Sequence, residues 1–208
     1  MKIYFLSMGC AKNTADSEHL TAQLEALGHI ITDSPDGADT AIINTCGFIQ
    51  DAVKENVDAI LDLEKLKQDG GIKRVIVAGC LVNRYEEELR AELSQTVDLF
   101  ARSEEWEKVI TFLGGQYNPN CQTVSTSLTN TFWTRYLKIS EGCNTNCSYC
   151  AIPLIRGKLR SIPVKQLVSE ALMLCAAGAK ELCLVGQDLT VYGQDTGSSL
   201  QELVHALN

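Results

Sequence analysis

The chain has 208 residues, of which 45% are hydrophobic and 21% are charged, proportions typical of a soluble globular protein. The sequence contains no apolar run long enough to span a membrane. Residues 1–6 read as a strand without the cleavage pattern of a signal peptide, so we expect a cytoplasmic protein.

The net charge of −8 is concentrated in the first half of the chain. Residues 1–113 hold 11 Lys and Arg against 20 Asp and Glu, whereas residues 143–208 hold five of each kind. An acidic domain disfavours nucleic-acid binding, because phosphates are bound by Lys and Arg, and it favours a basic protein partner. An acidic surface that serves solubility alone is the alternative.

Strands and helices are expected to alternate along residues 1–113. Apolar runs predict the strands, and residues Val53, Val57, Ile60 and Leu61 show helical periodicity. The expected strands cover 2–9, 29–33, 40–46 and 74–80, and the expected helices cover 14–27, 50–67, 85–93 and 104–112. This alternation predicts an α/β fold with a doubly wound parallel sheet of the flavodoxin-like type.

The pattern changes in the second half of the chain. Residues 114–134 are rich in Asn, Thr, Ser and Gly, which is typical of a linker between domains. Residues 135–208 then carry two βα units, with strands expected at 136–140 and 181–185 and helices at 163–177 and 200–207. Because a two-stranded sheet is marginal by itself, we expect this part to be the beginning of a (β/α) barrel whose remainder is absent from the chain.

Nine cysteines are a high count, and in a reducing compartment they favour metal ligands over disulfides. Three of them, Cys143, Cys147 and Cys150, lie within eight residues in a C-x₃-C-x₂-C pattern. Three thiolates can hold three irons of a 4Fe–4S cluster and leave the fourth iron open to a small molecule. With Tyr149 beside them, the pattern indicates S-adenosylmethionine as that molecule. A zinc site with a fourth ligand from elsewhere is the alternative.

A second set of cysteines, Cys10, Cys46 and Cys80, lies at the carboxyl ends of three predicted strands. In a parallel sheet these ends line one edge, where ligands bind, so we expect a second cluster there. Glycine precedes Cys10 and Cys80 and follows Cys46, which lets the backbone approach closely. The alternative is three buried core cysteines. The remaining cysteines are not expected to be ligands: Cys175 and Cys183 read as core residues, and Cys121 lies in the linker.

These motifs resemble those of the methylthiotransferases, a family within the radical S-adenosylmethionine superfamily. The cysteine loop at 143–150 resembles the radical signature, and the stretches that extend the resemblance are Gly9-Cys10-Ala11-Lys12-Asn13, 16–18, 44–48, 78–80, 136–143, 152–161, 186–188 and 192–193. Ala11-Lys12-Asn13 and Ile155-Arg156-Gly157 are similar to the RimO-type enzymes, which methylthiolate an aspartate of a small-subunit ribosomal protein. Residues 131–134 depart from the family pattern.

The resemblance implies two 4Fe–4S clusters and S-adenosylmethionine as cofactors. Cys143, Cys147 and Cys150 would hold the catalytic cluster, and Cys10, Cys46 and Cys80 the auxiliary cluster that supplies sulfur. The implied cofactor-binding residues are Asn13, Asn44, Tyr149, Arg156, Gln187 and Asp188. The implied product carries a methylthio group on the β-carbon of an aspartate, and the implied electron donor is a flavodoxin or ferredoxin.

Two alternative functions stay open at this point. One is the family's transfer-RNA enzyme, which applies the same chemistry to an adenosine. The other, of a different class, is a non-catalytic iron–sulfur or zinc module. The family's C-terminal substrate-binding β-domain, of the TRAM type, is not in the sequence, so we expect this chain alone to be inactive.

The candidates other than cysteine also have structural interpretations. Asn13 reads as a helix N-cap with Asp16 and Glu18 in the first turn. Asn44 could merely close a strand, and Tyr149 could pack within its loop. The two remaining alternatives are a solvated loop arginine for Arg156 and a capping role for Asp188.

Overall fold

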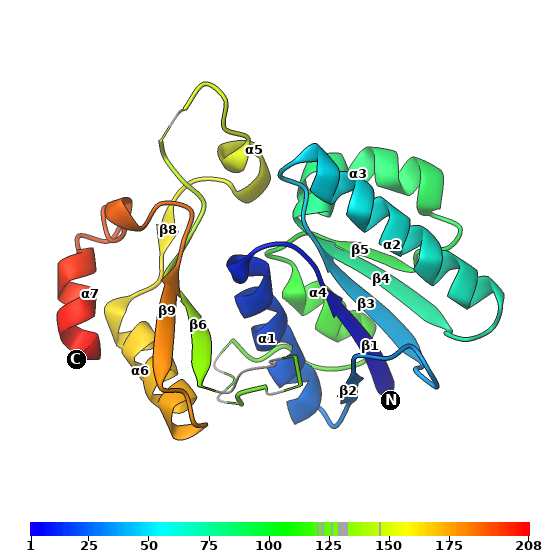
Figure 1. Ribbon diagram of the computed structural model, residues 1–208, viewed down its shortest axis with the longest axis horizontal. Helices are drawn as coiled ribbons and strands as arrows, with labels where there is room; N and C mark the ends of the chain where they lie inside the picture. Colours follow the sequence, from blue (N-terminus) through cyan, green and yellow to red (C-terminus); the bar gives the residue numbers. More distant parts are fainter. Residues whose placement is uncertain (120, 122, 126, 129–132, 146) are drawn as a thin grey trace. The chain divides into compact units, whose positions relative to one another are not determined.

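The computed structural model describes residues 1–119, 121, 123–125, 127–128, 133–145 and 147–208. The chain forms two compact units, Met1–Leu128 and Thr129–Asn208, which we call the N-terminal and C-terminal units (Figure 1). Among the helices of the described residues, none combines the length and apolar character needed to cross a bilayer.

The N-terminal unit is built on a parallel sheet with the strand order β2-β1-β3-β4-β5. The strands are β1 (Lys2–Ser7), β2 (Ile30–Thr32), β3 (Thr40–Thr45), β4 (Arg74–Gly79) and β5 (Leu99–Ala101). This is the flavodoxin-like order, in which the chain reverses direction across the sheet between β1 and β3. The predicted fold class is therefore confirmed. The sequence analysis missed β5, a strand of three residues that pairs with β4.

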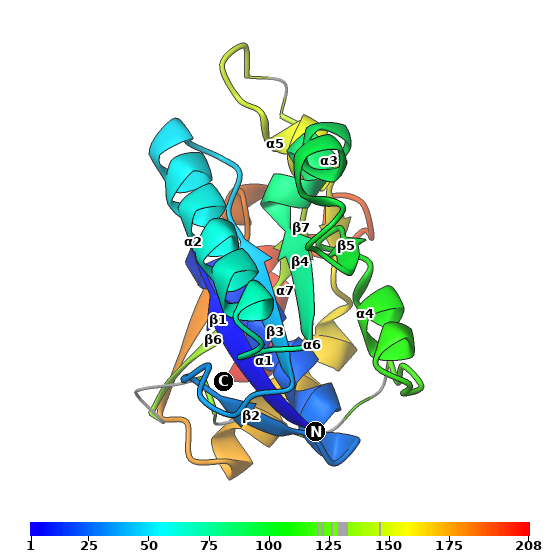
Figure 2. The same ribbon diagram turned by 90° about the vertical axis from the view of Figure 1, so that its right-hand side faces the viewer.

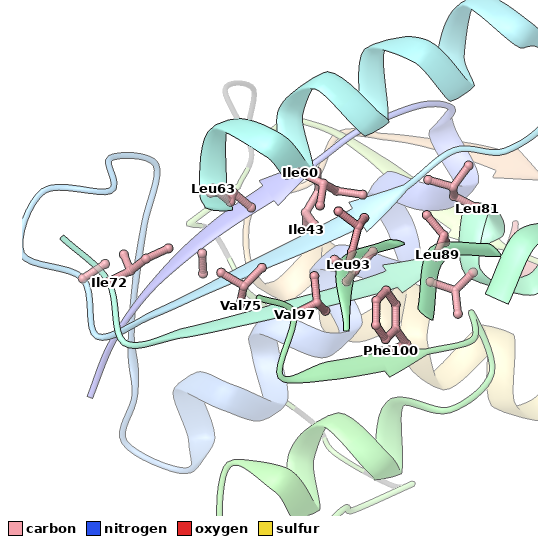
Figure 3. Packing of buried hydrophobic residues seen from close by; sticks show 14 residues of the cluster. Ile43, Ile60, Leu63, Ile72, Val75, Leu81, Leu89, Leu93, Val97 and Phe100 are labelled. Atoms are coloured by element: carbon pink, nitrogen blue, oxygen red, sulfur yellow. The ribbon is translucent and has the colours of Figure 1, made fainter. Parts of the chain in front are cut away.

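Helices cover both faces of this sheet, as Figures 1 and 2 show. They are α1 (Ala11–Ala26), α2 (Gln50–Gln68), α3 (Cys80–Leu93) and α4 (Trp106–Phe112). Successive residues of a strand point to opposite faces. Ile43 therefore joins the core on the side of α2 and α3, and Ile42 joins the core on the side of α1 and α4. Figure 3 shows the first of these cores, with Phe100 of β5 inside it.

Two helices begin earlier than the sequence pattern indicated. Helix α1 begins at Ala11 with Cys10 as its N-cap residue, and α3 begins at Cys80 with Gly79 as its N-cap residue. Neither cap residue makes a side-chain capping hydrogen bond, so the usual start signal was missing from the sequence. The prediction that Asn13 caps α1 is wrong, since it lies inside the first turn.

The same shift moves two carboxylates out of the first turn of α1. Asp16 and Glu18 are buried, with 1% and 5% of their surface exposed, and no acidic residue lies in the first turn. The prediction that Asp16 and Glu18 interact with the positive end of the helix dipole from the first turn is therefore wrong.

The expected linker packs partly onto the N-terminal unit. Tyr117 and Leu128 contact the core between the sheet and α1 and α4, and the backbone N–H of Asn118 donates to the side chain of Gln23 at 3.0 Å. The predicted linker ran to residue 134, and within it residues 120, 122, 126 and 129–132 lie outside the described residues. Two of the residues that depart from the family pattern are among them.

The C-terminal unit contains one parallel βαβ unit and one short antiparallel pair. Strand β6 (Thr134–Lys138) pairs with β9 (Glu181–Val185), and β7 (Ser140–Glu141) pairs with β8 (Arg160–Ser161). The helical segments of this unit are α5 (Ile152–Arg156), α6 (Val164–Ala176), η1 (Leu189–Val191) and α7 (Leu200–Leu207).

The core of the C-terminal unit contains Leu137 and Leu167, both fully buried. Cys183 is half-buried on β9, whereas Cys175 is exposed on α6. The prediction of a core position is therefore wrong for Cys175, because the adjacent Leu174 takes the inward position on that helix.

Candidate metal centres

The cysteines of the N-terminal unit follow three strands that are neighbours in the sheet. Cys10 lies beyond the end of β1, Cys46 directly follows β3, and Cys80 directly follows β4. The register pairs Ser7 with Asn44 and Thr45 with Gly79, so the three strands end at nearly the same level. None of the three cysteines forms a disulfide, and their exposure decreases from Cys10 to Cys46 to Cys80.

Two of these thiols share one acceptor atom. The Sγ atoms of Cys10 and Cys80 lie 4.0 and 3.8 Å from Oδ1 of Asn13. Cys46 lies close to Gly9, since a Cβ added to that glycine would lie 3.3 Å from Sγ of Cys46 and 3.2 Å from Nδ2 of Asn13. The structure therefore gathers the three cysteines around the first turn of α1, as the strand pattern predicted.

Glycine is required at two positions of this edge. Gly9 and Gly79 have φ values of +101° and +100°, in the region that favours glycine. A Cβ on Gly79 would also lie 2.6 Å from the carbonyl oxygen of Thr45 and would collide with Oδ1 of Asn44. The backbone next to Cys80 can approach β3 only because this side chain is absent.

Two residues that the sequence reading missed hold the loop at Cys46. The backbone N–H of Cys46 donates to Oδ1 of Asn56 at 3.0 Å, and Nη1 of Arg84 donates to the carbonyl oxygen of Gly47 at 2.8 Å. Asn56 belongs to α2, and Arg84 belongs to α3. Asn56 could have been found from the sequence, because it is a polar residue one helical turn before Ile60 on the otherwise apolar face of α2.

The cysteine loop of the C-terminal unit is anchored at its first thiol. Cys143 is 8% exposed, and its backbone N–H donates to the carbonyl oxygen of Gly157 at 3.1 Å. Cys147 is exposed and Cys150 is half-buried, with the Cys150 N–H donating to the Cys147 carbonyl at 3.1 Å. Asn146, between the first two cysteines, lies outside the described residues. The loop thus presents its second thiol to solvent.

Gly142 permits the turn into this loop. It has a φ of +70°, and an added Cβ would lie 2.6 Å from the carbonyl oxygen of Gly157 and would collide with that of Lys158. The side chain of Asn144 then accepts the backbone N–H of Leu159 at 3.0 Å. The segment after α5 therefore forms one wall of the cysteine loop.

A carboxylate that the sequence reading missed organises the residues next to this loop. Glu141 accepts from Lys138 Nζ at 3.3 Å, from Arg156 Nη1 at 3.2 Å and from Gln187 Nε2 at 3.0 Å. Its side chain is 16% exposed. We call these four residues the Glu141 cluster. They come from β6, β7, α5 and the residues after β9, so the cluster connects these four segments beside the loop.

The cluster decides between the interpretations of Arg156. The side chain of Arg156 is 2% exposed, so the alternative of a solvated loop arginine is wrong. Asp188 accepts from the backbone N–H of Thr190 at 3.0 Å and caps η1, which confirms its capping interpretation. Tyr149 is 90% exposed, so the alternative of packing within its loop is wrong.

A tyrosine after η1 fixes strand β8. Tyr192 is buried, and its hydroxyl donates to the carbonyl oxygen of Ile162 at 2.7 Å. Burial raises the pKa of this hydroxyl above its ordinary value. The backbone N–H of Gly193 donates to Oγ of Ser161 at 2.9 Å, and Asp195 accepts the backbone N–H of Ser161 at 2.8 Å. Partial burial opposes ionisation of Asp195, but the hydrogen bonds from Ser161 lower its pKa below the ordinary value.

The donor sets fit iron–sulfur clusters, because thiolates are the usual ligands of such clusters. A four-iron cluster takes each thiolate on a different iron, so its ligands are spread over a larger object than the ligands of one ion. Each of the two sites offers three cysteines that form no disulfide, with glycine beside them where the backbone approaches closely, and this suits a cluster with one open iron.

Comparison with known proteins assigns both units to described families. Residues 2–101 match the family model described as "Uncharacterized protein family UPF0004", and residues 137–205 match the Radical SAM superfamily. Three proteins named "Ribosomal protein uS12 methylthiotransferase RimO" are 46%, 47% and 45% identical to this chain. They come from Pelodictyon phaeoclathratiforme, Prosthecochloris aestuarii and Chlorobaculum tepidum, and the alignments cover 100%, 93% and 93% of this chain.

The chain is similar over its whole length to a methylthiotransferase, and its second half matches the Radical SAM superfamily. It spans about half the length of the relatives it matches, since the three alignments cover 48%, 44% and 44% of those proteins. The thiols of Cys10, Cys46 and Cys80 lie within the first matched region, at residues 2–101. The other three candidate ligands, at 143, 147 and 150, lie within the second region.

Substitution of Gly79 by alanine should destabilise the protein strongly. Its φ of +100° and ψ of −160° fall in a region used almost only by glycine, and the added Cβ collides with β3. We expect a loss of about 3 kcal/mol or more in the free energy of unfolding, from strain and overpacking together. Gly70→Ala is the matched control, since Gly70 has a φ of +77° but open space around its Cβ, and should lose only about 1–2 kcal/mol. Equal losses in urea unfolding would contradict the collision.

Removal of the charge of Glu141 should loosen the C-terminal unit. Glu141→Gln keeps the shape of the side chain but leaves the buried guanidinium of Arg156 without this carboxylate. We expect a loss of about 2–4 kcal/mol, near the cost of breaking a buried ion pair. Glu105→Gln removes a comparable contact to Lys108 at 3.4 Å between exposed side chains and should lose about 0–1 kcal/mol. Hydrogen–deuterium exchange across residues 152–161 measures the difference, and equal protection in the two variants would refute the role of the cluster.

Proposed function

We propose that the protein is part of a methylthiotransferase that adds a methylthio group to the β-carbon of an aspartate in ribosomal protein uS12. The observation that carries the proposal is the presence of two separate sets of three cysteines, none of which forms a disulfide. Cys10, Cys46 and Cys80 surround one helix turn, and Cys143, Cys147 and Cys150 share one loop. The names of the similar proteins supply the substrate, and their family supplies the reaction.

The two thiol sets have different tasks in this proposal. When bound, a four-iron cluster with an open iron and S-adenosylmethionine supply the one-electron chemistry that makes a carbon radical and a carbon–sulfur bond. Cys143, Cys147 and Cys150 hold the cluster at which S-adenosylmethionine binds. Cys10, Cys46 and Cys80 hold the auxiliary cluster, and this set is accessible because Cys10 is exposed.

Residues near the cysteine loop position and shield the cofactor. Tyr149, with 90% of its surface exposed, can place its ring on the adenine of S-adenosylmethionine. Arg156 and Gln187 are held by Glu141, so their orientations are set before any ligand arrives. Asp188 contributes by capping η1, which follows Gln187 directly. Asn13 and Asn44 support the auxiliary set in the other unit.

The charge distribution favours a protein substrate over transfer RNA. Residues 1–113 carry 20 acidic against 11 basic side chains. Ribosomal proteins that bind RNA are basic, and an acidic surface attracts such a partner, whereas it repels the phosphates of transfer RNA. We propose a flavodoxin or ferredoxin as the reductant and the cytoplasm as the compartment, because free thiol ligands require reducing conditions.

Anaerobic reconstitution with iron and sulfide tests the two-site proposal. We expect about eight irons per chain, four for each cluster, and about four when Cys143, Cys147 and Cys150 are changed to alanine. Addition of S-adenosylmethionine should change the electron spin resonance spectrum of the wild-type chain but not that of this triple variant. About four irons in the wild-type chain, or zinc alone, would refute the second cluster.

The substrate is tested in cells that lack the gene of the complete protein. Mass spectrometry of uS12 should show an aspartate lighter by one methylthio group, whereas transfer RNA should keep its modified adenosines. Complementation with the complete gene is the control. Loss of the modification from transfer RNA alone would replace the proposed substrate with the nucleic acid.

A further inference from the structure

The side chain of Asn13 joins the ends of two strands. Asn13 is fully buried in the first turn of α1. Its Nδ2 donates to the carbonyl oxygen of Met8 at 2.8 Å and to that of Thr45 at 2.9 Å. Met8 follows β1 and Thr45 ends β3, so one amide group connects the segments that lead to Cys10 and Cys46.

The orientation of this amide follows from its partners. Backbone carbonyls can only accept hydrogen bonds, so the NH₂ group of Asn13 must face Met8 and Thr45. Its Oδ1 must then face the other way, toward the thiols of Cys10 and Cys80 at 4.0 and 3.8 Å. The same side chain therefore contacts all three cysteine-bearing segments.

The backbone of Asn13 is anchored as well. Nδ2 of Asn44 donates to the carbonyl oxygen of Asn13 at 3.1 Å and to Oγ of Ser17 at 2.9 Å. Ser17 in turn shares a hydrogen bond of 2.8 Å with Ser7 at the end of β1. These buried bonds hold the first turns of α1 against β1 and β3, so the position of Asn13 relative to the strand ends is set.

We infer that Asn13 is a positioning residue that holds Cys10, Cys46 and Cys80 in their ligand arrangement before iron arrives. The auxiliary site is then preformed in the metal-free chain, and cluster assembly does not have to order three loops at once. The inference rests on the proposed function only in naming an iron–sulfur cluster as the occupant. The preformed arrangement itself is a property of the metal-free protein.

Thiol pairing in the metal-free chain measures this arrangement directly. Diamide takes up two electrons and two protons from a pair of thiols, which become a disulfide. Because Cys10 and Cys80 share one acceptor atom, we expect them to pair faster than either does with Cys121, Cys175 or Cys183. Trypsin separates the two cysteines, since Lys12 and Arg74 lie between them in the sequence, and mass spectrometry then identifies the linked peptides.

Asn13→Ala should slow formation of the Cys10–Cys80 disulfide by about tenfold, because two buried hydrogen bonds to the strand ends are lost. Thr21→Ala is the matched control. Thr21 is also fully buried on α1, but its hydroxyl bonds only to carbonyl oxygens of its own helix, at Ser17 and Glu18. This variant should pair its thiols at the wild-type rate.

Iron uptake provides the second measurement. In the chain whose loop cysteines at 143, 147 and 150 are alanine, Asn13→Ala should lower the iron bound after reconstitution, and Thr21→Ala should not. Circular dichroism checks that each variant is folded. If Asn13→Ala unfolds the chain, Asn13→Asp replaces it, since aspartate keeps the shape but cannot donate to Met8 and Thr45.

The outcomes separate this inference from the proposed function. Wild-type pairing rates in a folded Asn13 variant would overturn the inference, as would equal slowing in Thr21→Ala. A wild-type chain that forms the disulfide rapidly but binds no iron would refute the proposed function and leave the positioning role of Asn13 intact.

Discussion

The parallel register of β1, β3 and β4 is the constraint on which the N-terminal unit depends. Adjacent parallel strands end at one edge of a sheet, and here Thr45 pairs with Gly79, so the residues that follow them begin level with each other. Cysteines separated by more than thirty residues in sequence thereby become neighbours. The glycines at 9 and 79 let the strand ends approach one another closely, and the buried amide of Asn13 connects them, so the three cysteines form a candidate site.

In the C-terminal unit, the charged side chain of Glu141 holds the residues around the cysteine loop. Its cysteines are already close in sequence, so the fold needs only to hold one loop and the side chains around it. Glu141 does this because a carboxylate with little exposure attracts several donors and keeps them in place. Gly142 and the segment at 157–159 shape the loop from the other side.

Much of this was predictable because the central strands are strongly apolar. Residues 40–45 and 75–79 are buried on both faces, and sequence patterns of that kind indicate a parallel sheet. The beginnings of α1 and α3 were not predictable, because Cys10 and Gly79 cap them without a side-chain hydrogen bond. Strand β5 was missed, whereas the equally short β2 lay within the predicted range 29–33, and β5 takes its place by pairing with β4.

The sequence by itself determined the candidate ligands, their grouping into two sets of three and the resemblance to the methylthiotransferases, because cysteine spacing and strand-end position are local features. Only the tertiary structure decided the roles of Asn13, Asn56 and Glu141. Each of these side chains contacts partners that are distant in sequence, Thr45 for Asn13, Cys46 for Asn56 and Gln187 for Glu141. Such contacts exist only after the strands have paired, so no local pattern of residues carries them.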